Sequence, residues 1–265
     1  MIVKITLQKR FLYFLILIWA VFFLSFLSFL SAKSYANVDS GNQTLMASIS
    51  DLFNEQTAKN YASVQPLNQT ITWQVYLPEN YSPENPPGLL VYISPGNSGE
   101  IPDDWQDIMD EFNLIWIGAD NSGNNADTHK RLTYALLAPR VIAHNRYSVN
   151  SDRVYLSGFS GGGRVASLLA SDFPSIFKGA IYNSGANKWL NMTPEKLEIM
   201  KNNRYVFITG REDFNLNDTK RVYRFYKKAG LENLKLKVIS RMGHDNPSQK
   251  NYAQAIKFID ASHSR

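Results

Sequence analysis

A serine lies between glycines at the end of a predicted strand. Residues 153–157 are predicted to form the strand, the run Gly158-Phe159-Ser160-Gly161-Gly162 follows, and residues 162–171 have a helical pattern. A G-x-S-x-G run at a strand-to-helix turn is typical of a nucleophilic serine, because the glycines let strand and helix approach closely and leave the hydroxyl exposed. The helix N-terminus adds N–H groups that favour developing negative charge. Ser160 is therefore the candidate nucleophile.

The same glycines have a second interpretation, a phosphate-binding loop of the dinucleotide type. Gly158, Ser160 and Gly163 would then occupy the three glycine positions of that loop. This interpretation fits poorly, because one of the three is a serine and the run does not belong to the first strand–helix–strand unit. The sequence therefore favours the nucleophile.

A serine hydroxyl needs a base within hydrogen-bond reach, and that base needs an acid to orient it. His244 follows the predicted strand 233–240 on a glycine-containing loop and precedes a predicted helix near 249–261. A serine at the end of a strand needs its base on a loop that follows a later strand of the same sheet, and His244 has this position. We therefore predict that His244 is the base, ahead of the other three histidines, His129 in a polar loop, His144 on a predicted helix and His263 in the C-terminal tail.

The acid is expected between the serine and the histidine along the chain. Residues 205–209 form a predicted strand that ends at a glycine, and Asp213 lies three residues beyond that glycine. Asp213 is the preferred candidate, with Glu212 and Asp218 as alternatives.

The composition excludes several classes of chemistry. The 265 residues contain no cysteine, so disulfides, a cysteine nucleophile, iron–sulfur clusters and thiolate zinc sites are ruled out. The net charge is +5, but residues 1–36 carry four basic residues and no acidic one. The rest of the chain is nearly neutral, which argues against a nucleic-acid partner. We see no metal-ligand spacing and no cofactor motif, so we expect neither a metal nor a cofactor.

The first 36 residues have the three parts of an export signal. Residues 1–10 are basic, residues 11–30 are apolar, and residues 31–36 end in small residues at 34 and 36. This order predicts a signal peptide cleaved after Ala36, and the length of the apolar run leaves an uncleaved N-terminal membrane anchor as the alternative. Both interpretations predict an exported protein, periplasmic or secreted.

Beyond the signal, we predict a polar lead-in over residues 37–69 and one catalytic domain over residues 70–265. The domain alternates apolar runs with helical patterns, which indicates an α/β fold with a mostly parallel sheet covered by helices on both faces. The predicted strands are 71–77, 89–93, 114–118, 153–157, 179–183, 205–209 and 233–240, and the predicted helices are 131–145, 162–171, 194–202, 218–229 and 249–261.

With the order serine, aspartate, histidine and the glycine-flanked serine, the chain resembles the α/β-hydrolases over roughly residues 70–260. It is most similar to single-domain secreted esterases of the polyhydroxybutyrate-depolymerase and feruloyl-esterase type, also in the run from Trp73 to Pro78. The resemblance implies an oxyanion hole formed by the N–H of Gly161 and a second donor, Gly96 or Asn97. Where many relatives have His-Gly, this chain has Pro-Gly-Asn.

The resemblance implies an exported serine hydrolase that cleaves small or polymeric carboxylic esters through an acyl-enzyme. The alternatives are a serine peptidase on the same fold, a non-catalytic binding protein, and a membrane-anchored interaction protein. We expect activity to fall below about pH 6–7, because the base must be neutral.

The substrate-binding region is expected to be an open cleft with little or no cap domain. The segment 187–202, where such folds insert a lid, is short, and residues 97–112 form a predicted loop with Trp105 and six acidic residues. Phe159 and Trp189 are the candidate substrate contacts.

Overall fold

The computed structural model describes residues 40–261, so the predicted signal peptide or anchor lies outside the described residues. Eight strands form one sheet in the order β1-β2-β4-β3-β5-β6-β7-β8. Strands β3 to β8 are parallel, and β2 runs antiparallel to both β1 and β4. The strands are β1 (Gly41–Ala47), β2 (Ile71–Leu77), β3 (Gly88–Ile93), β4 (Leu114–Ala119), β5 (Val154–Phe159), β6 (Gly179–Asn183), β7 (Arg204–Gly210) and β8 (Leu234–Ile239).

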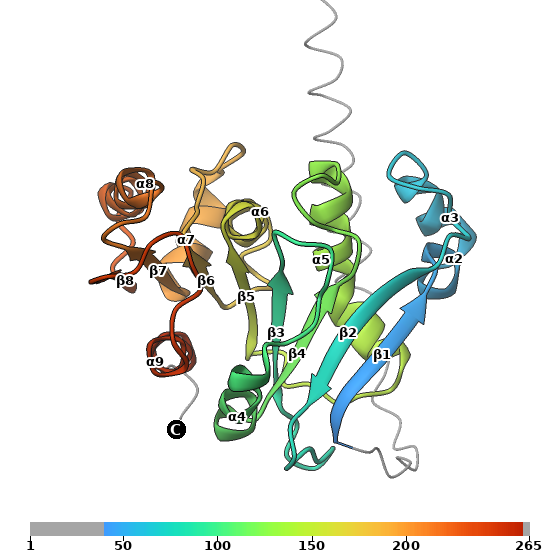
Figure 1. Ribbon diagram of the computed structural model, residues 1–265. Coiled ribbons are helices and arrows are strands. Elements are labelled where there is room, and N and C mark those ends of the chain that lie inside the picture. Colours follow the sequence, from blue (N-terminus) through green and yellow to red (C-terminus); the bar gives the residue numbers. More distant parts are fainter. Residues whose placement is uncertain (1–39, 262–265) are drawn as a thin grey trace, which may run out of the picture. The chain divides into compact units, whose positions relative to one another are not determined.

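Helices cover both faces of this sheet (Figure 1). Helix α4 packs against α9 on one face, and α5 packs against α6 on the other, where α7 and α8 also lie. The helices are α4 (Asp103–Phe112), α5 (Thr128–His144), α6 (Gly161–Asp172), α7 (Pro194–Asn202), α8 (Leu216–Lys228) and α9 (Gln249–Asp260). The predicted α/β fold class, the mostly parallel sheet and all seven predicted strands are confirmed.

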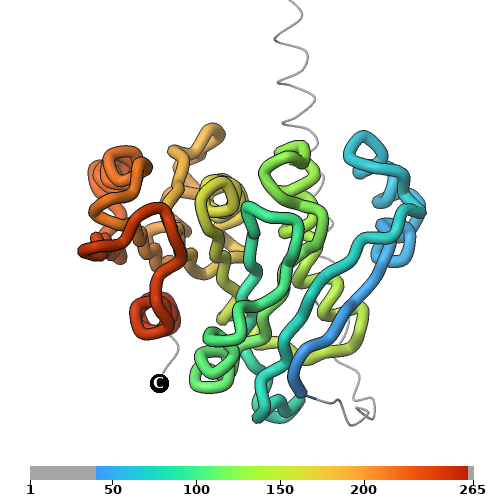
Figure 2. The backbone as a smooth tube through the Cα atoms, viewed as in Figure 1, coloured from blue at the N-terminus to red at the C-terminus, as the bar shows by residue number. Residues whose placement is uncertain are grey.

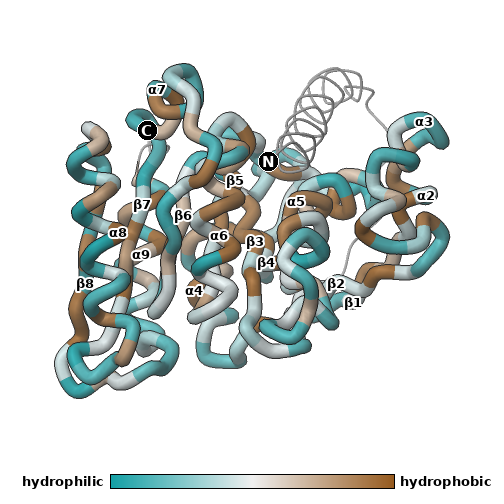
Figure 3. Tube along the Cα trace, turned by 90° about the horizontal axis from the view of Figure 1, so that it is seen from above, coloured by the Kyte–Doolittle hydropathy of each residue, from teal (hydrophilic) through white to brown (hydrophobic). Residues whose placement is uncertain are grey.

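Strands β3 and β4 are buried along their whole length, as their continuous apolar runs predict for a sheet covered on both faces. Hydrophobic residues follow the central strands, and hydrophilic residues dominate the peripheral loops (Figure 3). The ring of Tyr92 on β3 stacks on Trp116 of β4 with centroids 4.4 Å apart. This rigid centre fixes the carboxyl ends of the strands from which the candidate site residues emerge.

Residues 97–112 were predicted to be a loop, and this prediction is wrong because most of them form α4. Trp105, Ile108 and Met109 recur at helical spacing and are buried. Trp105 stacks on Tyr252 of α9 with ring centroids 3.7 Å apart, so it belongs to the core and not to an exposed cleft. The acidic residues lie on the outer side of the same helix. Two of them, Asp103 and Asp104, are in its first turn, where negative charge stabilises the helix N-terminus.

The polar lead-in predicted for residues 37–69 contains regular structure. β1 pairs with β2 over seven residues, so the two strands run side by side along the chain trace in Figure 2. Within β1 the exposed Thr44 and Met46 alternate with the buried Leu45 and Ala47, the pattern of an edge strand with one face on the core.

The described chain forms two compact units, residues 40–47 together with 70–261, and residues 48–69. The smaller unit contains α2 (Ile49–Leu52), α3 (Glu55–Ala58) and the 3-10 helix η1 (Lys59–Tyr61). Its first helix begins with a capping box between Ser48 and Asp51, and Phe53 stacks on Tyr61. Between residues 40 and 261 we find no helix with the length and apolar character needed to span a bilayer.

Candidate active site

Ser160 sits on a strained turn between β5 and α6. Its backbone has φ 55° and ψ −118°, a conformation that residues with a side chain rarely adopt. The turn is held from both sides, since the Ser160 N–H donates to Asn183 O at 2.8 Å and the Ser160 carbonyl accepts from the Arg164 N–H at 3.1 Å. The hydroxyl is thereby turned out of the sheet at the carboxyl end of β5.

The glycines around Ser160 are required by close backbone contacts. A Cβ atom on Gly162 would lie 1.8 Å from the carbonyl oxygen of Ile93 on β3. A Cβ atom on Gly158 would lie 2.5 Å from the Gly162 carbonyl carbon. Only glycine lets β3, β5 and the start of α6 approach this closely, as the sequence pattern predicts.

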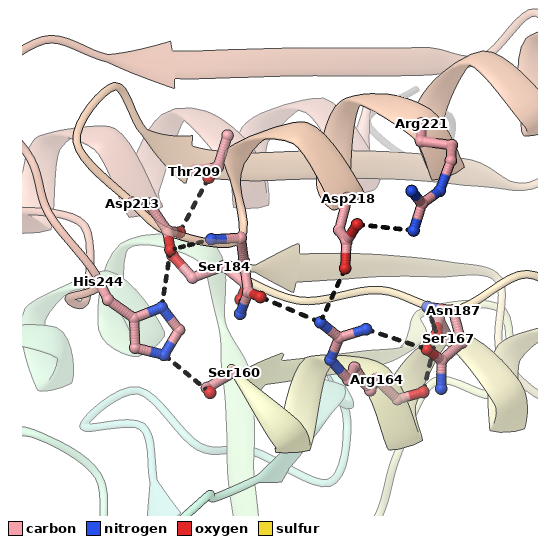
Figure 4. A network of polar contacts seen from close by, with 11 residues as sticks. Ser160, Arg164, Ser167, Ser184, Asn187, Thr209, Asp213, Asp218, Arg221 and His244 are labelled. Atoms are coloured by element: carbon pink, nitrogen blue, oxygen red, sulfur yellow. Dashed lines mark hydrogen bonds and ion pairs between the residues drawn. The ribbon is translucent and has the colours of Figure 1, made fainter.

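The histidine ring joins the serine to the aspartate. His244 Nε2 lies 2.8 Å from Ser160 Oγ, and His244 Nδ1 lies 2.8 Å from Asp213 Oδ1 (Figure 4). Both distances are within hydrogen-bond range. The structure therefore brings together the three side chains that were predicted as nucleophile, base and acid, from the loops that follow β5, β7 and β8.

Asp213 is held as an anion by its hydrogen bonds. Its side chain is fully buried, and Thr209 Oγ1 donates to Oδ2 at 2.9 Å while the Asn215 N–H donates to Oδ1 at 2.8 Å. Burial by itself raises the pKa of the carboxyl, but the hydrogen bonds from Asn215, His244, Ser184 and Thr209 outweigh burial and hold the pKa below its usual value. A carboxylate in this state can orient a histidine and stabilise its protonated form.

The loops that carry Asp213 and His244 are joined to each other. The Glu212 N–H donates to Met242 O at 3.0 Å, and a Cβ atom on Gly210 would lie only 1.9 Å from the same oxygen. Asn246, two residues after His244, accepts a hydrogen bond from Asn183 Nδ2 at 3.1 Å. These contacts fix the imidazole relative to the carboxylate before any substrate binds.

The rejected alternatives lie elsewhere. Glu212 is exposed, and Asp218 pairs with Arg221 and Arg164. The ring of His129 lies near Asp127 at the start of α5, and His144 is exposed at the end of that helix, while His263 is outside the described residues.

Two loops flank Gly161, the first predicted oxyanion donor. In the loop after β3, the carbonyl of Asn97 accepts from Asn121, and the N–H of Gly96 donates to Ser94 Oγ at 3.1 Å. In the loop after β4, the side chain of Asn124 touches Gly161 so closely that a Cβ atom there would lie 2.0 Å from Asn124 Oδ1. Asn124 was not predicted, because nothing in its local sequence marks it as a neighbour of the serine.

Buried Arg131 holds these two loops together. Its Nε donates to Ser122 O at 2.8 Å and its Nη2 donates to Ser94 O at 3.0 Å. Because one guanidinium binds a carbonyl from each loop, Arg131 fixes the spacing of the backbone beside Gly161.

Two aromatic rings lie against the imidazole of His244. The ring of Phe159 is 5.0 Å away and the ring of Phe214 is 4.0 Å away, centroid to centroid. Phe214 is 77% exposed and was not predicted. Trp189, the other candidate substrate contact, packs against Phe225 and Tyr226 of α8, with ring centroids 4.5 and 4.8 Å apart.

Among residues 40–261, no group of three or more histidine or acidic side chains is placed to hold a metal ion. The segment between β6 and β7 contains α7 as its only helix, so this part of the described chain has no cap domain, as predicted.

Comparisons with known proteins give a clear result for the fold. No family model matches the chain, and no curated protein matches it by sequence. Among solved structures, it is similar to a mutant of the feruloyl esterase module from Clostridium thermocellum complexed with sinapinate, with 13% identity, a TM-score of 0.58, and coverage of 89% of this chain and 98% of that one.

It is also similar to two structures from Staphylococcus aureus. One is an S-formylglutathione hydrolase, with 14% identity, a TM-score of 0.54, and coverage of 84% of this chain and 97% of that one. The other is a fluorophosphonate-binding serine hydrolase with substrate bound, with 14% identity, a TM-score of 0.58, and coverage of 84% and 99%. The chain has the α/β-hydrolase fold.

Proposed function

We propose that this protein is an exported serine hydrolase that cleaves carboxylic esters. The observation that supports the proposal most directly is the hydrogen-bonded line from Asp213 through His244 to Ser160, with 2.8 Å at each step, at a strained strand-to-helix turn. The similar solved structures include a feruloyl esterase module and an S-formylglutathione hydrolase, both of which act on esters or thioesters by their names.

The first half of the reaction transfers the acyl group to the enzyme. His244 Nε2 accepts the proton of the Ser160 hydroxyl while Oγ attacks the ester carbonyl carbon. Asp213 keeps the proton of the imidazole on Nδ1, so that Nε2 is free to act as the base, and stabilises the imidazolium that forms. The imidazolium then gives its proton to the leaving alcohol, and the acyl group stays on Ser160.

Developing negative charge on the carbonyl oxygen is stabilised by backbone donors. The N–H of Gly161, at the start of α6, is one donor, and the loop of Gly96 and Asn97 supplies the other. The N–H of Gly96 is engaged by Ser94 Oγ, which favours the N–H of Asn97 as the second donor. Each donor contributes roughly 3–4 kcal/mol to the stability of the transition state.

In the second half, His244 accepts a proton from a water molecule while the water oxygen attacks the acyl carbonyl. The ester bond to Ser160 then breaks, the imidazolium returns the proton to Ser160 Oγ, and the acid is released. The rings of Phe214 and Phe159 lie against the imidazole, so they are placed to contact the acyl and alcohol groups that the scissile bond joins.

Hydrolysis of p-nitrophenyl esters of increasing chain length tests the activity, with feruloyl and peptide substrates in parallel. We expect Ser160→Ala to lower kcat by roughly 10⁴-fold or more, and a fluorophosphonate probe to label the wild type at Ser160 only. His129→Gln is the matched control for His244→Gln, because the side chain of His129 is exposed at the start of α5 and its ring lies beside Asp127. Full esterase activity in Ser160→Ala would contradict the proposal, and turnover of peptides alone would favour a peptidase.

Export is the remaining part of the proposal. It is supported by the basic, apolar and small-residue order of residues 1–36. Sequencing the N-terminus of the protein from a host cell envelope and medium tests it. We expect Asn37 as the first residue, whereas a protein that starts at Met1 in the membrane fraction would indicate an anchor.

A further inference from the structure

A cavity of about 380 Å³ lies between α6, α8 and the loop that follows β6. Its walls combine apolar and charged side chains from all three segments. The lining residues are Arg164, Leu168, Ala186, Asn187, Lys188, Leu190, Asp218, Arg221 and Val222.

The charged side chains of this cavity are mainly positive. Three cationic residues line it, and among the described residues that line it Asp218 is the only carboxylate, which leaves an excess of two positive charges. Asp218 accepts from Arg221 at 2.6 Å and lies 3.5 Å from Arg164 Nη2. The ammonium of Lys188 lies 5.0 Å from the centroid of the Phe225 ring. A carboxylate in the cavity would therefore meet unbalanced cationic donors.

The cavity lies next to the backbone of the turn that carries the candidate nucleophile. Arg164 lies one helical turn after Ser160 on α6, an axial distance of about 6 Å, and its N–H donates to the Ser160 carbonyl. The loop after β6 is shared, because a Cβ atom on Gly185 would lie 2.2 Å from the Ser160 carbonyl oxygen while Ala186 lines the cavity. Figure 4 shows the guanidinium of Arg164 between Asn187 and Asp218, beside the line of Ser160 and His244.

We infer that this cavity is a subsite for a carboxylate on the ester substrate, with an aliphatic stretch between the carboxylate and the scissile carbonyl. The cationic side chains bind the carboxylate, and Leu168, Leu190 and Val222 contact the aliphatic stretch. Leu190 is 78% exposed without a ligand, so part of its surface is available for such a contact. The inference rests on the proposed ester hydrolysis and names its substrate class as acidic esters.

A pair of substrates of equal length tests the subsite. Mono-p-nitrophenyl adipate carries a carboxylate at the far end of its six-carbon acyl chain, and p-nitrophenyl hexanoate does not. The pocket variant is Lys188→Gln with Arg221→Gln. The surface variant is Arg224→Gln with Lys227→Gln, which makes the same change in charge and residue type on exposed positions of α8 outside the lining residues.

We expect the ratio of kcat/KM for the adipate ester to kcat/KM for the hexanoate ester to fall about tenfold or more in the pocket variant, through a higher KM for the adipate ester. The surface variant should keep the wild-type ratio. An equal ratio in all three proteins, or a fall of the same size in the surface variant, would overturn the subsite.

Direct binding separates a failure of the subsite from a failure of the proposed function. If neither ester is hydrolysed in a Ser160-dependent way, the esterase proposal fails. Calorimetric titration with adipate then still tests whether the cavity binds a carboxylate. We expect adipate to bind the wild type and the surface variant, and to bind the pocket variant about tenfold more weakly. Absence of adipate binding to the wild type would overturn the inference.

Discussion

The hydroxyl of Thr209 offers the sharpest test of how the candidate acid is held. Thr209 Oγ1 donates to Asp213 Oδ2 at 2.9 Å, and both side chains are fully buried. Valine has nearly the shape of threonine without the hydroxyl, so Thr209→Val removes this hydrogen bond and leaves the carboxylate oxygen without that donor. A lost hydrogen bond to a buried charged group costs roughly 1.5–3 kcal/mol.

The same substitution should also affect catalysis. Asp213 Oδ1 keeps its bonds to His244 and Asn215, so the carboxylate stays in place but its orientation is held by one hydrogen bond fewer. We expect Thr209→Val to lower the free energy of unfolding by about 2 kcal/mol and to lower kcat about tenfold, measured by urea titration and p-nitrophenyl hexanoate hydrolysis. Thr209→Ser, which keeps the hydroxyl, should retain most of the activity.

A second buried threonine provides the matched control. Thr219 on α8 is also 0% exposed, but its hydroxyl has no hydrogen-bond partner among the described residues. Thr219→Val therefore removes an unpaired polar group, and we expect it to raise the free energy of unfolding by about 1 kcal/mol and to leave kcat unchanged. If both valine variants shift stability in the same direction by similar amounts, the hydrogen bond to Asp213 does not account for the effect.

Three further outcomes are expected. Gly163→Ala should destabilise the fold by about 3 kcal/mol in thermal unfolding, because its Cβ would lie 2.4 Å from Gly185 O, whereas Gly243→Ala, with open space around its Cβ, should stay within about 0.5 kcal/mol. Because the pKa of Asp213 is lowered in the folded state, its contribution to stability is present above about pH 4 and is lost as pH falls through the folded-state pKa. The urea midpoints of the wild type and Asp213→Asn should therefore converge below about pH 4, and a constant gap down to pH 2 would contradict this. Phe214→Ala should lower kcat/KM for p-nitrophenyl benzoate relative to the acetate about fivefold, and an unchanged ratio would remove Phe214 from the substrate contacts.

The sequence predicts the central sheet and the order of the site residues for a physical reason. Strands buried on both faces must be apolar throughout, so 89–93 and 114–118 are visible as continuous runs. A parallel sheet collects the residues that follow its strands at one edge, so Ser160, Asp213 and His244 could be placed together from local sequence alone.

The sequence fails where pairing or packing decides the structure. β1 is a polar edge strand whose conformation depends on its partner β2, so its residues resemble a loop when they are considered alone. Helix α4 was missed because its many acidic residues outweighed the helical spacing of Trp105, Ile108 and Met109. The packing of Trp189 against Phe225 and Tyr226 of α8 could not be predicted either, because it joins rings that lie far apart along the chain.

The buried Asn215 links the candidate acid to the cationic cavity, because it bonds both Asp213 and Arg164. Its N–H donates to Asp213 Oδ1, its side-chain oxygen accepts from Arg164 Nη2 at 3.1 Å, and its side-chain nitrogen donates to Ser184 O at 2.8 Å. Arg164 is thus only two hydrogen bonds away from the acid, so a substitution at Arg164 would disturb proton transfer and anion binding together. Lys188 and Arg221 line the cavity and contact Phe225 and Asp218, and for this reason their loss can change substrate preference separately from the chemical step.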